Sequence, residues 1–225
     1  MTRRLDAPPV PHGDDEGLTF FSTWNVGTPE RQRAAVEAIA HAWESRPWPH
    51  EGLLSYSVYE GVGGRTLMHH SRWRDERAYQ EYFARGRDER NAEVDAAVPD
   101  VERVRLTKTR LYRSVTPGTD ARVPGVYVRT EVDFEGPDAD RQRDWADAVA
   151  TALDDCPAPG LIGAHLHLST DGTRVVTYAA WETEGDHERE VNAPAEGEAW
   201  RRVRAFPGVK ESVVRRYRFA FGVSA

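Results

Sequence analysis

The chain has 225 residues and a formal net charge of −7, because 37 acidic side chains outnumber 30 basic ones. This balance disfavours binding to nucleic acids or anionic membranes, since proteins that bind polyanions carry an excess of basic residues. Cys156 is the only cysteine, so no disulfide can form within the chain, which is typical of a reducing, cytoplasmic location. The sequence contains neither an apolar run long enough to span a membrane nor, in residues 1–17, the apolar segment of an export signal.

An internal repeat runs through the sequence at an offset of 108 residues. The matched pairs are Leu53 and Leu161, Arg65 and Thr173, Trp73 and Trp181, Pro99 and Pro207, and Val101 and Val209. A repeat of this length indicates duplication of a small domain, since solenoid repeats are shorter and more numerous. We therefore predict a disordered tail at 1–17, one module at 18–113, a second module at 125–225, and a Pro- and Gly-containing linker at 114–124.

Each module shows the same order of predicted elements. In the first, a strand at 18–26 precedes a helix that begins at Thr28-Pro29-Glu30, where the threonine can cap the helix and the proline fits its first turn. A hairpin then follows, and after it a helical stretch and a last strand. The predicted ranges are 53–60, 65–73, 75–97 and 101–113 in module one, and 125–134, 138–154, 161–182, 184–205 and 209–221 in module two.

The order β-α-β-β-α-β predicts a ferredoxin-like fold for each module. Such a module covers one face of its sheet with its own helices and leaves the other face bare. A bare apolar face must be buried, so we predict an α+β protein whose two modules pack sheet to sheet as an intrachain dimeric α+β barrel. Sheet edges that remain free after this pairing would allow a homodimer.

Alternation along the strands predicts which side chains face the space between the sheets. In residues 161–169 the aliphatic positions face the helices, which directs His165 and His167 to the inter-sheet face. We expect an aromatic pocket in module one and a more charged one in module two, with Arg129, Glu131 and Asp133. The predicted pocket of module one contains Phe21, Thr23, Asn25, Ser57, Tyr59, His69 and Trp73.

The stretch from Ser71 to Tyr79 is a strand that ends in Trp73 and runs into an acidic helix with an aromatic residue six positions on. This stretch resembles the antibiotic biosynthesis monooxygenase family, and the tandem repeat matches the fused members of that family, of the type found in actinomycetes. The resemblance implies a dimeric α+β-barrel fold and a cofactor-independent monooxygenase that oxidises tricyclic phenols to quinones with O2.

The same resemblance implies site residues. The family pocket carries an Asn four residues before the Trp, a Tyr six residues after it, and an Arg further along the helix. In this sequence His69 takes the Asn position, Trp73 and Tyr79 match directly, and Arg87 and Arg90 lie in the region of the Arg.

We therefore predict that the first module oxidises a polycyclic aromatic or polyketide-type phenol in secondary metabolism. His69 would act as the base, because the pKa of histidine ordinarily lies near neutrality. Trp73 and Tyr59 would stack on the rings, and Asn25 or Tyr79 would bind a developing oxyanion. The remaining predicted contacts to substrate are Phe21, Thr23, Ser57, Trp181 and His165.

Several alternatives stay open at this point. Trp73 and Trp181 could serve core packing alone. The site could cyclise or isomerise a similar substrate without O2, or bind a small molecule without catalysis. No cofactor is expected, but His165 and His167 have a spacing that could bind Fe(II) with Glu131 or Asp133. Haem-degrading relatives use a strand Asn, a Trp and a helical His, for which Asn25, Trp73 and His187 are the loose matches.

Overall fold

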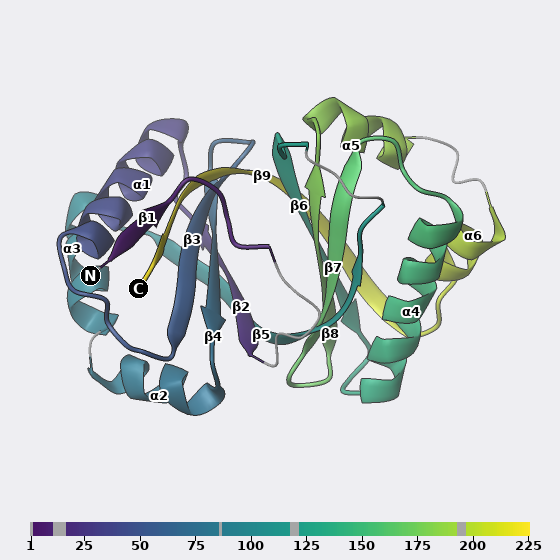
Figure 1. Ribbon diagram of the computed structural model, residues 1–225, viewed down its shortest axis with the longest axis horizontal. Coiled ribbons are helices and arrows are strands. Elements are labelled where there is room, and N and C mark those ends of the chain that lie inside the picture. The colour runs from purple at the N-terminus through teal and green to yellow at the C-terminus, as the bar shows by residue number, and fades with distance from the viewer. Residues whose placement is uncertain (1, 11–16, 86, 118–121, 193–196) are drawn as a thin grey trace. The chain divides into compact units, whose positions relative to one another are not determined.

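The computed structural model describes residues 2–10, 17–85, 87–117, 122–192 and 197–225, and it divides into two compact units. Unit 1 comprises residues 2–10, 17–108 and 217–225, and unit 2 comprises residues 109–216 without the undescribed positions. Figure 1 shows the elements in chain order.

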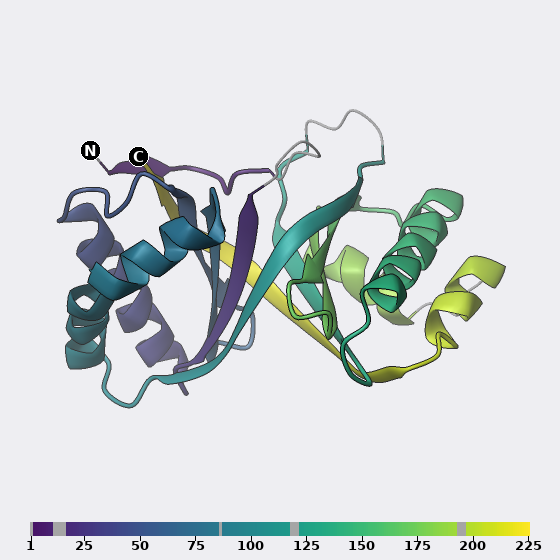
Figure 2. The same cartoon turned by 90° about the horizontal axis from the view of Figure 1, so that it is seen from below.

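Unit 1 is an antiparallel sheet with helices on one face (Figures 1 and 2). Its strands lie in the order β1-β9-β3-β4-β2-β5. Its elements are β1 (Arg3–Leu5), β2 (Leu18–Asn25), α1 (Pro29–Glu44), β3 (Leu53–Gly61), β4 (Thr66–Trp73), α2 (Glu76–Arg85), α3 (Arg87–Ala97), the first part of β5 (Glu102–Val115) and the last part of β9 (Val209–Ser224).

Unit 2 repeats this arrangement, with the strand order β5-β7-β8-β6-β9. Its complete elements are β6 (Val126–Phe134), α4 (Ala139–Asp155), β7 (Leu161–Ser169), β8 (Arg174–Trp181), α5 (Glu184–Asn192) and α6 (Glu198–Arg204). Within each unit the four strands of the repeat lie in the ferredoxin-like order 2-3-1-4. The predicted α+β class and the tandem ferredoxin-like modules are confirmed.

The last strand of each repeat is divided between the two units. Residues up to Lys108 of β5 belong to unit 1, whereas Thr109–Val115 pair with β7 in unit 2. In the same way, the end of β9 from Tyr217 onward pairs with β3 in unit 1. The division therefore differs from the predicted boundaries at 113 and 125, because each long strand completes the edge of two sheets.

The beginning of the chain is more ordered than predicted. Arg3–Leu5 pair with Gly222–Ser224, Arg4 forms a 2.7 Å ion pair with Glu44, and the Thr2 hydroxyl donates to the Arg46 carbonyl at 2.9 Å. Unpaired backbone at the edge of β9 explains why a polar segment orders here. Residues 11–16 of the expected tail and residues 118–121 of the expected linker lie outside the described residues.

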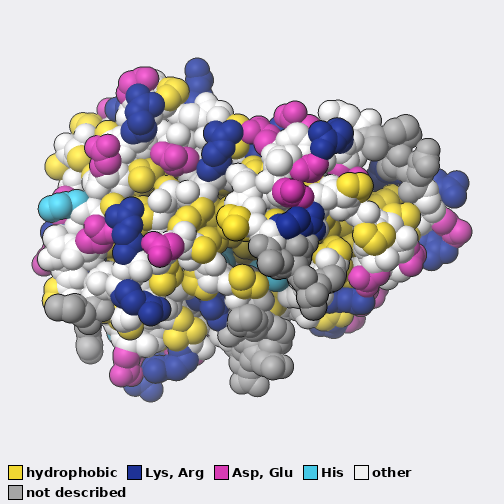
Figure 3. All heavy atoms as spheres, turned by 45° about the horizontal axis from the view of Figure 1, so that its top comes forward, with side chains coloured by type: hydrophobic (Ala, Val, Ile, Leu, Met, Phe, Trp, Pro, Cys, Tyr) yellow, Lys and Arg dark blue, Asp and Glu magenta, His cyan; other side chains and the backbone are white. Residues whose placement is uncertain are grey.

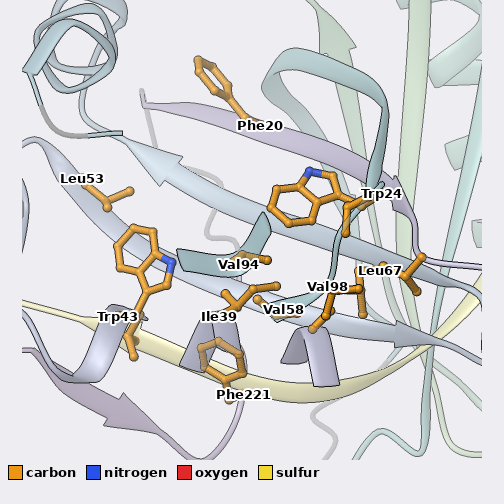
Figure 4. Close-up of a cluster of buried hydrophobic side chains, with 14 of the residues drawn as sticks. Phe20, Trp24, Ile39, Trp43, Leu53, Val58, Leu67, Val94, Val98 and Phe221 are labelled. Carbon is orange, nitrogen blue, oxygen red and sulfur yellow. The ribbon is translucent and has the colours of Figure 1, made fainter. Parts of the chain in front are cut away.

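Helix α1 begins as the sequence predicts, with Thr28 as its N-cap and Pro29 in its first turn. The Thr28 side chain accepts a 3.3 Å hydrogen bond from the Arg31 backbone N–H. The buried face of α1 carries Ile39 and Trp43 into the core of unit 1, shown in Figure 4. Phe221 joins the same core from β9, with 1% of its surface exposed.

Strand register fixes which side chains of unit 1 face this helix-covered core. Residues paired directly across an antiparallel ladder point to the same face. Ser22 pairs with His69, Trp24 with Leu67, and Val58 with His69. Because Leu67, Trp24 and Val58 belong to the core cluster beneath α1 and α3, His69 also lies on the helix-covered face.

The surface mixes both charges. Figure 3 shows acidic and basic side chains interspersed over the visible face. No helix in the described parts of the chain is both long and apolar enough to span a membrane.

Candidate functional site

Unit 1 contains a cavity of about 310 Å³ between its sheet and its helices. Aromatic and polar side chains dominate its wall: Phe20, Trp24, Trp43, Tyr56, His69, Ser71, Trp73, Tyr79, Tyr82, Arg90 and Arg103. Tyr56 and Trp43 stack with ring centroids 4.2 Å apart, and Tyr79 meets Phe20 edge-on at 4.7 Å. Flat aromatic walls of this kind suit a polycyclic ligand.

His69 forms part of this wall, with 5% of its surface exposed. Its Nδ1 is 2.5 Å from the Tyr56 hydroxyl. Burial, and after it the positive charge of Arg103, lowers the pKa of His69 to about 3. The imidazole is therefore neutral at physiological pH.

The hydrogen bond fixes the His69 tautomer. Burial raises the pKa of Tyr56, so its hydroxyl keeps its proton. As a protonated hydroxyl, Tyr56 donates its proton to His69 Nδ1. The His69 proton is then on Nε2, which is buried and has no hydrogen-bond partner among the described atoms. His69 thus presents an N–H donor in the cavity wall.

Arg90 supplies a buried positive charge. It is 9% exposed, donates one hydrogen bond to the Pro47 carbonyl at 3.0 Å, and stacks over Trp43 at 5.0 Å. Its Nε is buried without a partner, and the charges of Glu89 and Glu93 act on it without a direct ion pair among the described residues. Burial lowers the pKa of Arg90, but a guanidinium stays charged at neutral pH. Because buried charges are normally compensated, Arg90 favours an anionic ligand.

Trp73 and Tyr79 also line this cavity. The Trp73 indole N–H donates to the Ser71 hydroxyl at 2.9 Å, so this donor is already used. Tyr79 meets Trp73 edge-on at 5.4 Å. Their catalytic and binding roles stay predictions. Of the two arginines expected near the family position, Arg90 lines the cavity, and the side chain of Arg87 lies outside the described residues.

The structure corrects the predicted pocket for five residues. Phe21, Thr23, Ser57 and Tyr59 pair with His70 or Met68 and so point to the sheet face that the unit's helices do not cover. The prediction placed the whole pocket on the bare face of the sheet. His69 and Trp73 alternate in phase with the core residue Leu67 and so lie on the helix-covered face. The predicted pocket therefore combined residues of opposite faces. Asn25 is exposed at the end of β2, where its amide donates to Glu102 at 3.1 Å.

The predicted histidine pair of module two lies on the bare face of its sheet, outside the cavity of unit 2. His165 Nδ1 is 2.9 Å from the Ser114 hydroxyl, and His167 Nδ1 is 3.4 Å from the Thr109 hydroxyl. Glu131 pairs with Arg129, and Asp133 pairs with Arg174. No cluster of three His, Cys, Asp or Glu side chains in the described chain could hold a metal ion, so the Fe(II) alternative lacks a carboxylate ligand.

Trp181, the other predicted contact in module two, lines a separate cavity of about 590 Å³ within unit 2. His187 lines the same cavity, and its Nδ1 accepts a 3.0 Å hydrogen bond from Arg216. The His187 proton is therefore on Nε2, where an iron ligand would need a lone pair. Asn25 and Trp73 do not share a cavity in unit 1 either, so the residues do not fit the haem alternative.

Sequence analysis missed two important side chains of the unit 1 cavity, Tyr56 and Trp43. Strand alternation was the available signal for Tyr56, because it places Tyr56 on the opposite sheet face from Ser55 and Ser57. A register shift between Leu53 and Ser55 obscures this phase at the start of β3. Helical spacing marks Trp43 as a buried position and does not indicate that it lines a cavity.

Comparison with known proteins places this geometry in context. No family model and no curated protein matches the sequence. Among solved structures, one described as an anthrone oxidase-like protein has a TM-score of 0.77 at 20% identity, over 96% of this chain and 97% of that one. The resemblance inferred from the sequence is confirmed at the level of the fold.

Two further structures show the range of proteins with this fold. A Lactobacillus acidophilus protein provisionally named a monooxygenase has a TM-score of 0.59 at 11% identity, over 92% of this chain and 96% of its own. A mutant chlorite dismutase of Candidatus Nitrospira defluvii has a TM-score of 0.57 at 12% identity, over 92% of each chain. Since one fold hosts different reactions, the function must be argued from the site.

Proposed function

We propose that this chain is a cofactor-independent monooxygenase that oxidises a polycyclic phenol with O2 in the cavity of unit 1. The observation that carries the proposal is a buried cation without a direct ion pair among the described residues, Arg90, in the same aromatic wall as an unpartnered N–H donor, His69. The likeness to an anthrone oxidase-like structure over nearly the whole chain supports this reaction type.

The chemistry needs a substrate that can give an electron-rich anion. A phenol bound beside Arg90 ionises more readily, because a nearby positive charge stabilises the phenolate. The His69 N–H donates a hydrogen bond to the phenolate oxygen or to an oxyanion that develops during oxidation. The ring carbanion attacks O2 to form a hydroperoxide at that carbon, and loss of water leaves a carbonyl group.

His69 has a different role from the predicted one. A group with a pKa of about 3 is a weak base at neutral pH, so it does not remove the substrate proton efficiently. As a neutral donor held by Tyr56, it instead stabilises negative charge. The proton goes to solvent, and the cation at Arg90 makes that loss favourable.

The proposal is tested by oxygen uptake. Metal-stripped protein is supplied with a dihydroxyanthrone and compared with a no-protein blank, with quinone formation followed in parallel. We expect uptake above the blank, with one O2 consumed for each quinone formed. Substrate consumption without oxygen uptake would indicate the cyclase or isomerase alternative, and binding without turnover would indicate a binding module.

Matched variants in the two cavities test which cavity supports the reaction. His69→Gln and Arg90→Met alter the cavity of unit 1, whereas His187→Gln alters the cavity of unit 2. We expect the first two variants to lower oxygen uptake and the third to retain it. Loss of activity only in His187→Gln would contradict the assignment to unit 1.

A further inference from the structure

We propose that the cavity of unit 2 is a second ligand site, which binds a neutral, largely apolar molecule bearing a carbonyl oxygen. Its wall lies entirely within unit 2 and includes Thr177, Trp181, His187 and Trp200. The argument rests on the donors and charges of this cavity, so it does not depend on oxygenation in unit 1.

The first observation is the size of the cavity. At about 590 Å³ it is nearly twice as large as the unit 1 cavity of about 310 Å³. In unit 1, Phe20 and Tyr56 both pair with Ser71, whereas in unit 2 Val128 and Ala164 both pair with Ala179. Two aromatic side chains of the repeat are thus replaced by two small ones, and the space they leave is not refilled. The second cavity therefore accepts a bulkier ligand.

The second observation concerns the tryptophan shared by both repeats. In unit 1 the Trp73 N–H donates to the Ser71 hydroxyl at 2.9 Å. In unit 2 the residue at the place of Ser71 is Ala179, which has no acceptor. The Trp181 N–H is consequently buried without a partner. A buried donor without a partner carries a free-energy cost, which an acceptor on a ligand would remove.

Further donors line the same wall. The Trp200 N–H and the Thr177 hydroxyl are also buried without a partner among the described atoms. Burial, and after it the charge of Arg216, lowers the pKa of His187 to about 4, so its ring is neutral and carries its proton on Nε2. The cavity thus offers donors, and the complementary ligand group is an oxygen acceptor.

The charged side chains around the unit 2 cavity differ from those around the unit 1 cavity. Arg216 is held by Glu188 at 2.6 Å and by Glu184 at 3.7 Å, so it is not available to a ligand. Glu190 and Arg204 contribute opposite charges to the cavity wall. Without an uncompensated cation, the wall favours a neutral carbonyl compound over a phenolate.

The rim of the cavity is apolar. Val191 and Val214 line it while 58% and 47% of their surfaces are exposed. Exposed aliphatic side chains at a cavity mouth can contact the apolar body of an entering ligand. Donors inside and aliphatic groups at the rim together favour an apolar ketone.

The test compares two probes that differ by a single carbonyl group, 9-fluorenone and fluorene. Their affinities for the full chain are measured by isothermal titration calorimetry under nitrogen, without any oxidisable substrate. We expect fluorenone to bind about tenfold more tightly, which is the effect of one buried hydrogen bond. Equal affinities for the two probes, or no binding of fluorenone, would overturn the proposal.

Two variants locate the bound ketone. Trp181→Phe keeps the ring and removes the donor, and Ala179→Ser supplies Trp181 with the partner that Trp73 already has. Both should reduce the affinity for fluorenone to that for fluorene, and Ala179→Ser keeps the test valid if Trp181→Phe does not fold. Tyr112→Phe, which removes a hydroxyl bonded to Asp147 and lines neither cavity, is the control and should leave the affinity unchanged. Fluorenone binding that His69→Gln abolishes and both unit 2 variants retain would refute the site.

Discussion

The Tyr56 hydroxyl and His69 Nδ1 lie 2.5 Å apart in unit 1, on neighbouring strands of one sheet. The tyrosine thereby decides which nitrogen of His69 carries the proton, and it directs the remaining N–H to the cavity. The residue that we propose to contact the ligand, His69, and the residue that orients it, Tyr56, therefore come from β4 and β3, respectively.

Replacing Tyr56 by Phe should lower turnover more than substrate binding. Without the hydroxyl, the neutral His69 ring can place its proton on either nitrogen, and the cavity donor is lost for part of the time. We expect kcat to fall about tenfold or more, with a stability loss of about 1 kcal/mol. Steady-state kinetics and urea denaturation measure the two effects. Tyr112→Phe, which removes a surface hydroxyl bonded to Asp147, is the control and should leave kcat unchanged.

Stability should fall as the solution becomes acidic. The pKa of His69 is about 3 in the folded chain, whereas a histidine in an unfolded chain titrates near about 6.5. The unfolded state therefore binds the proton first. The stability that neutral His69 contributes is complete above about pH 6.5 and is lost progressively as the pH falls towards 3.

The free energy of unfolding measured in urea at several pH values tests this dependence. His69→Gln should flatten the curve between about pH 6.5 and pH 4, because its side chain does not titrate. The pKa of His187 is also lowered, to about 4, so the double variant with His187→Gln should be flatter still. Curves of equal slope for wild type and His69→Gln would show that His69 does not titrate as we infer.

Arg90→Met should separate stability from binding. Removing a buried charge that lacks a carboxylate partner costs the fold little, and a methionine of similar length fills the space. We expect the free energy of unfolding to change by less than about 1 kcal/mol. The affinity for a phenolate inhibitor should nevertheless drop about tenfold or more, because the counter-charge is gone. Arg33→Met on the exposed face of α1 should change neither quantity.

Phe221→Ala should destabilise unit 1, although the residue lies near the C-terminus. Its ring is 1% exposed in the unit 1 core, and truncation of such a side chain costs about 3–5 kcal/mol. Phe83→Ala, where 48% of the side chain is exposed, is the matched control and should cost far less. Tyrosine and tryptophan near-UV signals, followed with denaturant, report the loss. A Phe221→Ala variant as stable as Phe83→Ala would show that β9 does not complete this core.

The sequence predicted the fold well because its signals are local and repeated. Thr28 and Pro29 mark a helix start, and the matched pair Trp73 and Trp181 marks two copies of one module. The exchange of β5 and β9 between units has no comparable signal, because a strand that continues beyond Lys108 looks the same in sequence whichever edge it pairs with.

The site was predicted only in part, for a geometric reason. His69, Trp73 and Tyr79 were found through a short motif and do share a cavity. Asn25, Phe21 and Tyr59 were added from a face chosen by symmetry between modules, and that face is the opposite one. The proton position on His69 depends on Tyr56, which lies 13 residues earlier, and sequence spacing does not reveal such a contact.

The exchanged ends of β5 and β9 also bear on how the gene tolerates change. Codons 217–225 encode a segment that belongs to unit 1, most of which comes from residues 17–108. A stop codon at position 217 would therefore remove part of unit 1 and would leave most of unit 2 intact. Recombination that swapped one half for a homologous half would have to preserve the fit of both crossing strands. A change in either crossing strand thus affects both repeats, although each unit has a cavity of its own.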